Sequence, residues 1–311
     1  MEKPCLEDNL EEVVSVLLNH CYDMDILKPT AENKKKEAIL DSLIISMIKS
    51  KTDLKKLKEC IEDVKQDTII NTKFFDKGGN LFRDCVNSKW ESFAKELFRQ
   101  RSVGLGTPNA ASGEGELMLL FLSKKTEKPT KGDIKLDGKI IELKGDQPRV
   151  MGEISGNNFR NKTLEVCKSF NLTPNKAFRT NKDAVEVEKV THLEHWKREL
   201  AKLDLGKQKD FINKWLKCID NENHEESVEK IFVDETFNHP NFIKEIIKIL
   251  YAVMVADSGF DLFVILGDGT NVKIVKSDVN DFNQKVESGE ITPQNDYFRI
   301  NQRNNIGWYI K

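Results

Sequence analysis

The sequence predicts a mixed α/β protein whose first third is helical. Three observations lead to this fold class. Apolar residues recur at three- and four-residue spacing through residues 1–100, which is typical of amphipathic helices. A glycine-rich segment at 102–115 then interrupts this pattern. After it, segments 131–146 and 260–277 alternate apolar and polar residues around turn sequences, which indicates two β-hairpins.

The individual elements follow from local patterns. Residues 116–124, ELMLLFLSK, are apolar on nearly all sides and predict a buried helix. Residues 241–256 predict a second, mostly buried helix for the same reason. We expect helices in the first third at 10–21, 34–50, 53–65 and 89–101, a further helical stretch at 157–220, a strand at 230–235, a short helix at 278–288 and one or two strands at 297–311.

This order of elements predicts two domains, in line with a length of 311 residues. A helical domain is expected over 1–100. A mixed central sheet flanked by helices is expected over 101–311, with a helical insertion at 157–220.

Net charge, apolar run lengths and cysteine spacing indicate the kind of cellular compartment that we expect for this chain. The formal net charge is −2, so any affinity for nucleic acid must come from a local basic patch. The longest apolar runs, such as 249–256, are far shorter than the ~20 residues that span a membrane, so we expect no membrane segment. The acidic N-terminus lacks a signal-peptide pattern, and the six cysteines form no CxxC pair. We therefore expect free thiols in a reducing, cytoplasmic compartment.

The stretch KGDIKLDGKIIELKGD at 131–146 carries the main functional signal. Asp137-Gly138 is a strong hairpin turn, because a type I′ turn needs positive φ at both central residues. That turn places Asp133 opposite Glu142, and facing carboxylates repel one another. The alternation of faces predicts a core face with Ile134, Leu136, Ile141 and Leu143 and a polar face with Asp133, Lys135, Glu142 and Lys144.

The polar face has the groups that phosphodiester hydrolysis needs. Asp133 and Glu142 would bind a hard cation such as Mg²⁺, with Mn²⁺ as a substitute, and the main-chain carbonyl of Leu143 would complete the protein ligands. Lys144 would orient or deprotonate a water, or stabilise charge on a phosphate. The alternative is a solvated amphipathic hairpin whose lysines and acidic residues pair across the strands.

The spacing of Asp133, Glu142 and Lys144 resembles the motif of the PD-(D/E)XK nuclease superfamily, the fold of many restriction enzymes, resolvases and phage exonucleases. The likeness covers about a tenth of the chain, residues 113–145. Within the superfamily, the chain more closely resembles phage-encoded nuclease-like proteins with Gly-x-Gly-Glu, Gly-Asp and E-(L/V)-K-G. Gly132 stands where the family name has proline. The resemblance implies a restriction-endonuclease-like core over 101–311.

Many members of this superfamily also place a glutamate on the helix before the hairpin. Glu116 matches that position, and Glu114 is the competing candidate. The resemblance implies that Glu116 assists a metal ion or a water. An ordinary acidic residue in the first turn of a helix, favoured by the helix dipole, is an equally good interpretation of Glu116.

Basic residues around the hairpin are candidates for contacts with DNA phosphates. Those before and within the hairpin form the densest basic run, and those after it follow a glycine-punctuated loop that leads into a helix. Solvated surface or capping roles are the alternative for each of them. The candidates are Lys124, Lys125, Lys128, Lys131, Arg149, Arg160 and Lys162.

Other motifs are weak. The glycines at 104–106 and 113–115 match neither a Walker A loop nor a dinucleotide-binding loop, so we expect no nucleotide cofactor.

Taken with the resemblance, the hairpin predicts a Mg²⁺-dependent DNA endonuclease, in which the helical segments contact DNA or a second protomer of a homodimer. The alternative is a non-catalytic nucleic-acid-binding or assembly protein built on a nuclease fold.

Overall fold

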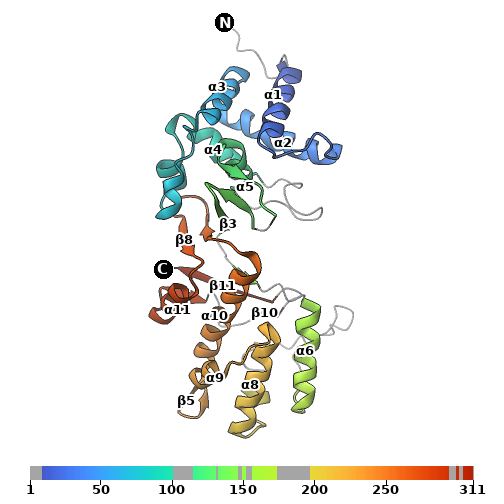
Figure 1. Ribbon diagram of the computed structural model, residues 1–311, viewed down its shortest axis with the longest axis vertical. Coiled ribbons are helices and arrows are strands. Elements are labelled where there is room, and N and C mark those ends of the chain that lie inside the picture. Colours follow the sequence, from blue (N-terminus) through green and yellow to red (C-terminus); the bar gives the residue numbers. More distant parts are fainter. Residues whose placement is uncertain are drawn as a thin grey trace. The chain divides into compact units, whose positions relative to one another are not determined.

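The computed structural model describes residues 9–100, 115–130, 132–145, 149–151, 156–173, 197–293, 299–300 and 304–310 (Figure 1). It is a mixed α/β protein, as the sequence predicts. The chain forms two compact units, which are described separately. The first contains Met1–Asp146 and Phe260–Lys276, and the second contains Gln147–Gly259 and Ser277–Lys311. The domain boundary expected at residue 100 lies inside the first unit.

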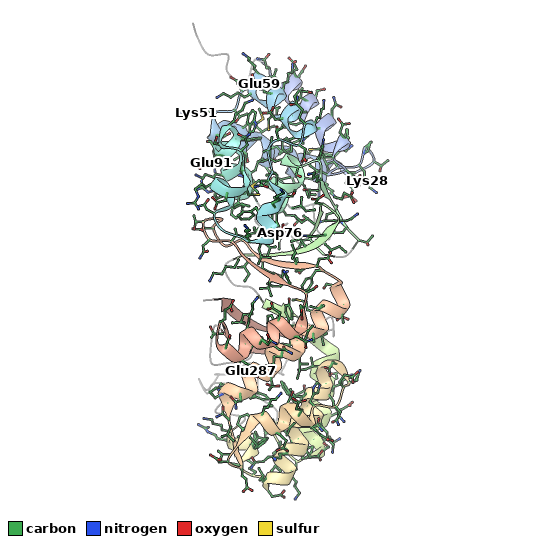
Figure 2. The ribbon with its side chains drawn as sticks, turned by 60° about the vertical axis from the view of Figure 1, so that its left-hand side comes forward. Lys28, Lys51, Glu59, Asp76, Glu91 and Glu287 are labelled. Atoms are coloured by element: carbon green, nitrogen blue, oxygen red, sulfur yellow. The ribbon has the colours of Figure 1, made fainter. Side chains whose placement is uncertain are left out.

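The first unit begins with helices that pack through their apolar faces. Helix α3 starts where the Asp53 side chain accepts a hydrogen bond of 2.8 Å from the Lys56 amide. Charged side chains such as Glu59 on this helix remain at the surface (Figure 2). The helices are α1 (Leu10–Asp23), α2 (Asn33–Ser50), α3 (Leu54–Lys65), α4 (Glu91–Phe98) and α5 (Glu116–Leu122), with short 3₁₀ or π turns at Thr72–Asp76, Leu81–Cys85 and Ser88–Trp90.

A five-stranded sheet completes the first unit, in the order β1-β2-β3-β7-β8. Both expected hairpins are confirmed, because β2 pairs antiparallel with β3 and β7 pairs antiparallel with β8. Strands β3 and β7 run parallel, so the chain must cross over between them. The strands are β1 (Thr126–Glu127), β2 (Ile134–Leu136), β3 (Lys139–Lys144), β7 (Leu262–Ile265) and β8 (Lys273–Lys276).

The crossover between β3 and β7 explains the division of the chain. Most of the second unit lies within this crossover, at Gln147–Gly259. Asp261 then fixes the parallel register, because its amide donates to the Ile140 carbonyl and its carboxylate accepts from the Ile140 amide, each at 2.8 Å. The helices expected at 157–220 therefore lie in a segment inserted between two adjacent strands.

One hydrophobic core joins the helices to the sheet in the first unit. All seven residues of α5 are buried, which confirms the buried helix expected at 116–124. His20 on α1 shares a hydrogen bond of 2.9 Å with the main-chain oxygen of Phe121 on α5. Burial lowers the pKa of His20, so the neutral imidazole is favoured. The core continues through both hairpin strands to Leu262 and Val264 on β7, which is why residues 1–100 do not stand apart from the sheet.

The second unit contains a small sheet and several helices. Its longest helix, α10, begins at the Asn238 cap and ends at Gly259, and confirms the mostly buried helix expected at 241–256. Tyr251 on α10 stacks on Phe282 at 3.7 Å between ring centroids. The elements are β4 (Arg149–Met151), α6 (Gly156–Ser169), α8 (Leu205–Asp220), α9 (Glu225–Ile231), β5 (Phe232–Val233), β6 (Thr236–Phe237), α10 (His239–Ser258), α11 (Val279–Ser288), β9 (Ile291–Pro293), β10 (Arg299–Ile300) and β11 (Asn304–Ile310).

Two further expectations concern composition. Five cysteines in the described residues are free and buried, at positions 21, 60, 85, 167 and 218. Cys5 lies outside the described residues. Among the helices that the structure describes, none is both long and apolar enough to cross a bilayer.

Candidate functional site

The β2–β3 hairpin has the register that the sequence predicts. Ile134 pairs with Ile141, and Leu136 pairs with Lys139. The turn residues at 137–138 have φ of 51° and 82°, as a type I′ turn requires. The core face of the hairpin is buried, whereas its polar face is partly exposed.

Asp133 lies just outside the strand ladder. Its amide donates to the Ile141 carbonyl at 3.1 Å, and its Oδ2 accepts from the Leu143 amide at 2.7 Å. The Asp133 carboxylate therefore accepts the main-chain hydrogen bond of β3 at a point that lies beyond the start of β2. The sequence predicted that Asp133 lies next to β3. Only the fold shows that its carboxylate is hydrogen-bonded to the main chain of that strand.

Gly132, which precedes Asp133, has a backbone conformation that excludes proline. Its φ is +80°, and proline cannot adopt this angle because its ring holds φ near −65°. A Cβ atom at this position would lie 2.7 Å from Cγ2 of Ile140. The local backbone thus demands glycine immediately before Asp133.

Glu142 and Lys144 meet Asp133 on the polar face. Lys144 Nζ contacts Glu142 Oε1 and lies 3.8 Å from Asp133 Oδ2. Burial raises the pKa of Glu142, the Asp133 charge raises it further, and the Lys144 ammonium opposes both effects. The Asp133 carboxylate is therefore close enough to Glu142 to disfavour the charged form of Glu142, as the sequence suggested.

Glu116 belongs to the same cluster. It is the first residue of α5 and is only 4% exposed. Its charge contributes to the raised pKa of Glu142. Gly115 makes this placement possible, since its φ is +80° and a Cβ there would lie 2.7 Å from Cδ1 of Leu266. The competing candidate, Glu114, lies outside the described residues.

Lys128 also belongs to this cluster, and no pattern in the sequence predicts its place there. Its Nζ contacts Glu116 Oε1 and donates to the main-chain oxygen of Asp133 at 3.1 Å. The sequence assigned Lys128 to a phosphate-binding run, and no local pattern links it to Glu116. Together, Glu116, Lys128, Asp133, Glu142 and Lys144 form a connected group, which we name the hairpin cluster.

The hairpin cluster has a donor set that fits a hard divalent cation with few protein ligands. In a strand, the amide and carbonyl of one residue point to the same side, so the Leu143 carbonyl faces the edge at which Asp133 lies. Mg²⁺ keeps several waters and needs only one or two carboxylates. In this structure the Lys144 ammonium balances the charge of Glu142. The described residues contain no group of three or more His, Cys, Asp or Glu side chains arranged for a metal ion.

The other basic candidates have varied surroundings. Lys124 Nζ donates to the Lys65 carbonyl at 2.8 Å, and Lys125 forms an ion pair of 2.7 Å with Asp67. The side-chain hydrogen bond to Asp67 and its charge raise the pKa of Lys125. These contacts hold both lysine side chains against the end of α3 and the residues that follow it.

The remaining basic candidates lie in the second unit or outside the described residues. Lys162, in the second unit, donates to Asn221 Oδ1 at 2.9 Å. Lys131 and the side chains of Arg149 and Arg160 lie outside the described residues, although β4 contains position 149 and α6 contains position 160.

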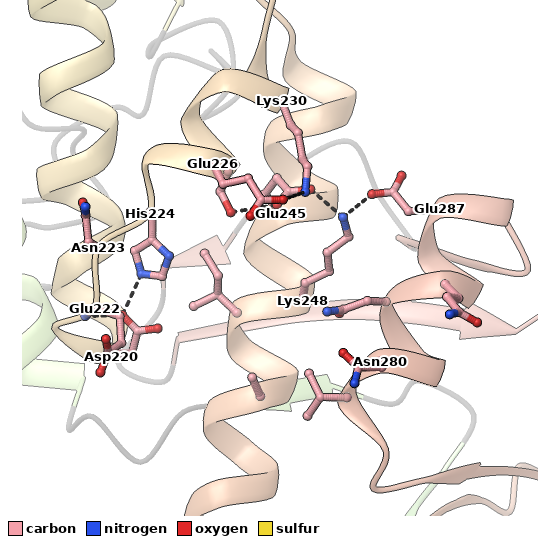
Figure 3. Close-up of a pocket in the computed structure, with 16 residues that line it drawn as sticks. Asp220, Glu222, Asn223, His224, Glu226, Lys230, Glu245, Lys248, Asn280 and Glu287 are labelled. Carbon is pink, nitrogen blue, oxygen red and sulfur yellow. Dashed lines mark hydrogen bonds and ion pairs between the residues drawn. The ribbon is translucent and has the colours of Figure 1, made fainter.

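The second unit contains a separate polar pocket of about 890 Å³ (Figure 3). Lys248 lines one side of this pocket, contacts Glu287, and forms a 2.6 Å ion pair with Glu245. On the opposite side, His224 shares a 2.7 Å hydrogen bond with Asp220 (Figure 3). No motif in the sequence predicts this pocket. The available signal was the pair Glu245 and Lys248, three residues apart within a mostly apolar helix.

No family model, curated protein or solved structure matches this chain.

Proposed function

We propose that this protein is a Mg²⁺-dependent DNA endonuclease and that the hairpin cluster is its active site. The main support is the meeting of three carboxylates and two lysines at one end of the hairpin. Glu142 has a raised pKa there because it is buried beside Asp133. Buried titratable groups with perturbed pKa values and a defined charge partner are typical of functional sites.

Each residue of the cluster has a distinct proposed role. Asp133, Glu142 and the Leu143 carbonyl would hold the ion. A bound Mg²⁺ supplies a Lewis acid and lowers the pKa of its water. Lys144 would leave the Glu142 carboxylate and hold the attacking water or the developing negative charge on the phosphate. Glu116, fixed by Lys128, would accept a hydrogen bond from that water.

The proposed substrate and setting follow from the same chemistry. Lysines near the cluster support a polyanionic substrate, and we propose DNA. Free, buried cysteines support a reducing, cytoplasmic setting. A homodimer would supply two such clusters, one for each strand of a duplex.

The test is incubation of the full chain with supercoiled, linear and branched DNA, and with RNA, in Mg²⁺ and in EDTA. Conversion of supercoiled DNA to open circles would indicate nicking, and discrete linear bands would indicate site-specific cutting of both strands. Lys135→Ala is a matched control, because Lys135 is on the same hairpin face but pairs with Glu127 at 2.9 Å. We expect Lys135→Ala to cut DNA at about the wild-type rate and Lys144→Ala to cut it about 100-fold more slowly. Wild-type protein that leaves every substrate intact in Mg²⁺ and Mn²⁺ would refute the proposal.

One observation favours a second candidate, a non-catalytic nucleic-acid-binding or assembly protein. Lys144 pairs with Glu142 and Lys128 pairs with Glu116, so these charges are partly neutralised without a metal ion. That protein would bind DNA without cutting it, and Mg²⁺ would not raise its melting temperature.

A further inference from the structure

A small pocket lies beside the hairpin cluster and shares Lys128 with it. Its volume is about 340 Å³, which is within the range of small-ligand sites. The α1–α2 loop, the start of α2, Leu120 on α5 and Lys128 line it. We name it the lysine pocket, because Lys28, Lys35 and Lys128 all face it.

The charge of the lysine pocket is strongly unbalanced. Three lysines line it against a single carboxylate, that of Asp25. Lys128 has Glu116 as a partner, but Lys28 and Lys35 make no ion pair with any residue that the structure describes. Lys28 is exposed at the surface of the first unit (Figure 2). Thr30 adds a hydroxyl group, so the lining suits an anion that accepts several hydrogen bonds.

The loop that carries two of these groups is held in one conformation. Lys28 and Ala31 close a turn with a 2.9 Å hydrogen bond, and Pro29 occupies the second position, where its fixed φ is favourable. Lys36 Nζ donates to the Pro29 carbonyl at 2.7 Å. Leu27 is 1% exposed, so the loop is anchored in the core. A loop held in this way binds a ligand with little further loss of conformational entropy.

The start of α2 points to the same ligand class independently. The first turn of this helix has three consecutive lysines at 34–36 and no acidic residue. Cations at a helix N-terminus are unfavourable, because the helix dipole places partial positive charge there. An anion bound next to that turn would offset the cost.

We propose, on the basis of the function proposed above, that the lysine pocket holds a phosphate group of the bound DNA strand, adjacent to the one that is cut. Lys128 links the two sites, because it lines the pocket and contacts Glu116 of the hairpin cluster. The phosphate in the pocket would thereby set the position of the strand over the carboxylates.

The test compares two double variants of the full chain by DNA binding at several salt concentrations. Lys28→Gln/Lys35→Gln removes two charges from the pocket. Lys49→Gln/Lys55→Gln removes two exposed lysines that do not line it. Fluorescence anisotropy with a duplex oligonucleotide measures the slope of log affinity against log salt. We expect the pocket variant to flatten this slope by about 0.9 units, because the one phosphate held in the pocket contributes about 0.9. The control should match wild type.

The outcomes separate this proposal from the proposed function. If wild type binds and cuts DNA but both double variants have the same salt slope as wild type, the pocket assignment is wrong and the nuclease proposal stands. If wild type does not bind DNA, both proposals fail. If inorganic phosphate raises the melting temperature of wild type but not of the pocket variant, while the DNA slope is unchanged, the pocket takes free phosphate and the strand assignment is overturned. Should the double variant fail to fold, each single variant is expected to flatten the slope by part of this amount, with a total of about 0.9 units for the one phosphate.

Discussion

The substitution Lys144→Ala removes an ammonium group that lies between two carboxylates. Its Nζ contacts Glu142 Oε1 and is 3.8 Å from Asp133 Oδ2. At an effective dielectric constant near 20, each attraction at this distance is about 4 kcal/mol before solvation is considered. The three side chains are 16–33% exposed, so solvent screening and the regained hydration of Lys144 offset most of it. We expect a net loss of about 1–3 kcal/mol in the free energy of unfolding.

Mg²⁺ should affect this variant more strongly than wild type. Without Lys144, the carboxylates have lost their nearby cation, and no ammonium competes for the metal position. A Mg²⁺ concentration 100 times the dissociation constant stabilises the folded state by about 2.7 kcal/mol. For a unit of this size, that corresponds to roughly 5–11 °C in melting temperature. Cleavage should nevertheless fall by about two orders of magnitude, the effect of removing one group that transfers a proton or stabilises charge.

Two assays on purified variants check these expectations. Thermal melting over a Mg²⁺ titration gives the stabilisation, and single-turnover cleavage of DNA gives the rate. Lys135→Ala serves as the control in both, because it removes a lysine from the same hairpin face. If Lys144→Ala cuts DNA at the wild-type rate, or if Mg²⁺ stabilises it less than wild type, the assigned role of Lys144 is wrong.

Further variants test the surroundings of the site and the second unit. Burial and the Asp133 charge raise the pKa of Glu142, so the protonated side chain is favoured in the folded state. The resulting stabilisation is fully present below pH 4.5 and is lost as pH rises through the pKa of the folded state. Without metal, Glu142→Gln should therefore be more stable than wild type at pH 7 but not at pH 4, as urea unfolding will show; equal differences at both pH values would contradict this. Gly115→Ala should cost about 2–4 kcal/mol, measured by urea unfolding, because φ is +80° and the new Cβ would crowd the core. Lys248→Ala should cost about 3–5 kcal/mol, because Glu245 stays buried without the ammonium group that balances its charge; a denaturation midpoint equal to that of wild type would show that this ion pair contributes little.

Local sequence signals predicted the hairpin well. The turn at 137–138 adopts positive φ at both residues, and the four expected core-face residues are buried. These features depend on the backbone preferences of adjacent residues and on the alternation of side chains along a strand. The buried helix at 116–124 was predictable for a similar reason, since a segment that is apolar all round has no face to present to water.

The composition of the hairpin cluster was only partly predictable. The sequence brought Asp133, Glu142 and Lys144 together through strand register, and the structure agrees. Lys128 joins the cluster because it contacts Glu116, twelve residues before it, across a loop with no regular periodicity. Lys124 and Lys125 stay apart from the cluster because they contact Lys65 and Asp67 in the helical region.

The sequence by itself determined the α/β class, the two hairpins and the core face of the first hairpin, because these depend on patterns within a few residues. Only the tertiary structure decided that residues 1–100 share a core with the hairpin, and that β3 pairs with β7 across the inserted second unit. It also decided that Lys28 and Lys35 share a pocket with Lys128. The physical reason is that contacts between distant segments depend on how whole apolar faces pack together. No short-range pattern in the chain encodes which faces will meet.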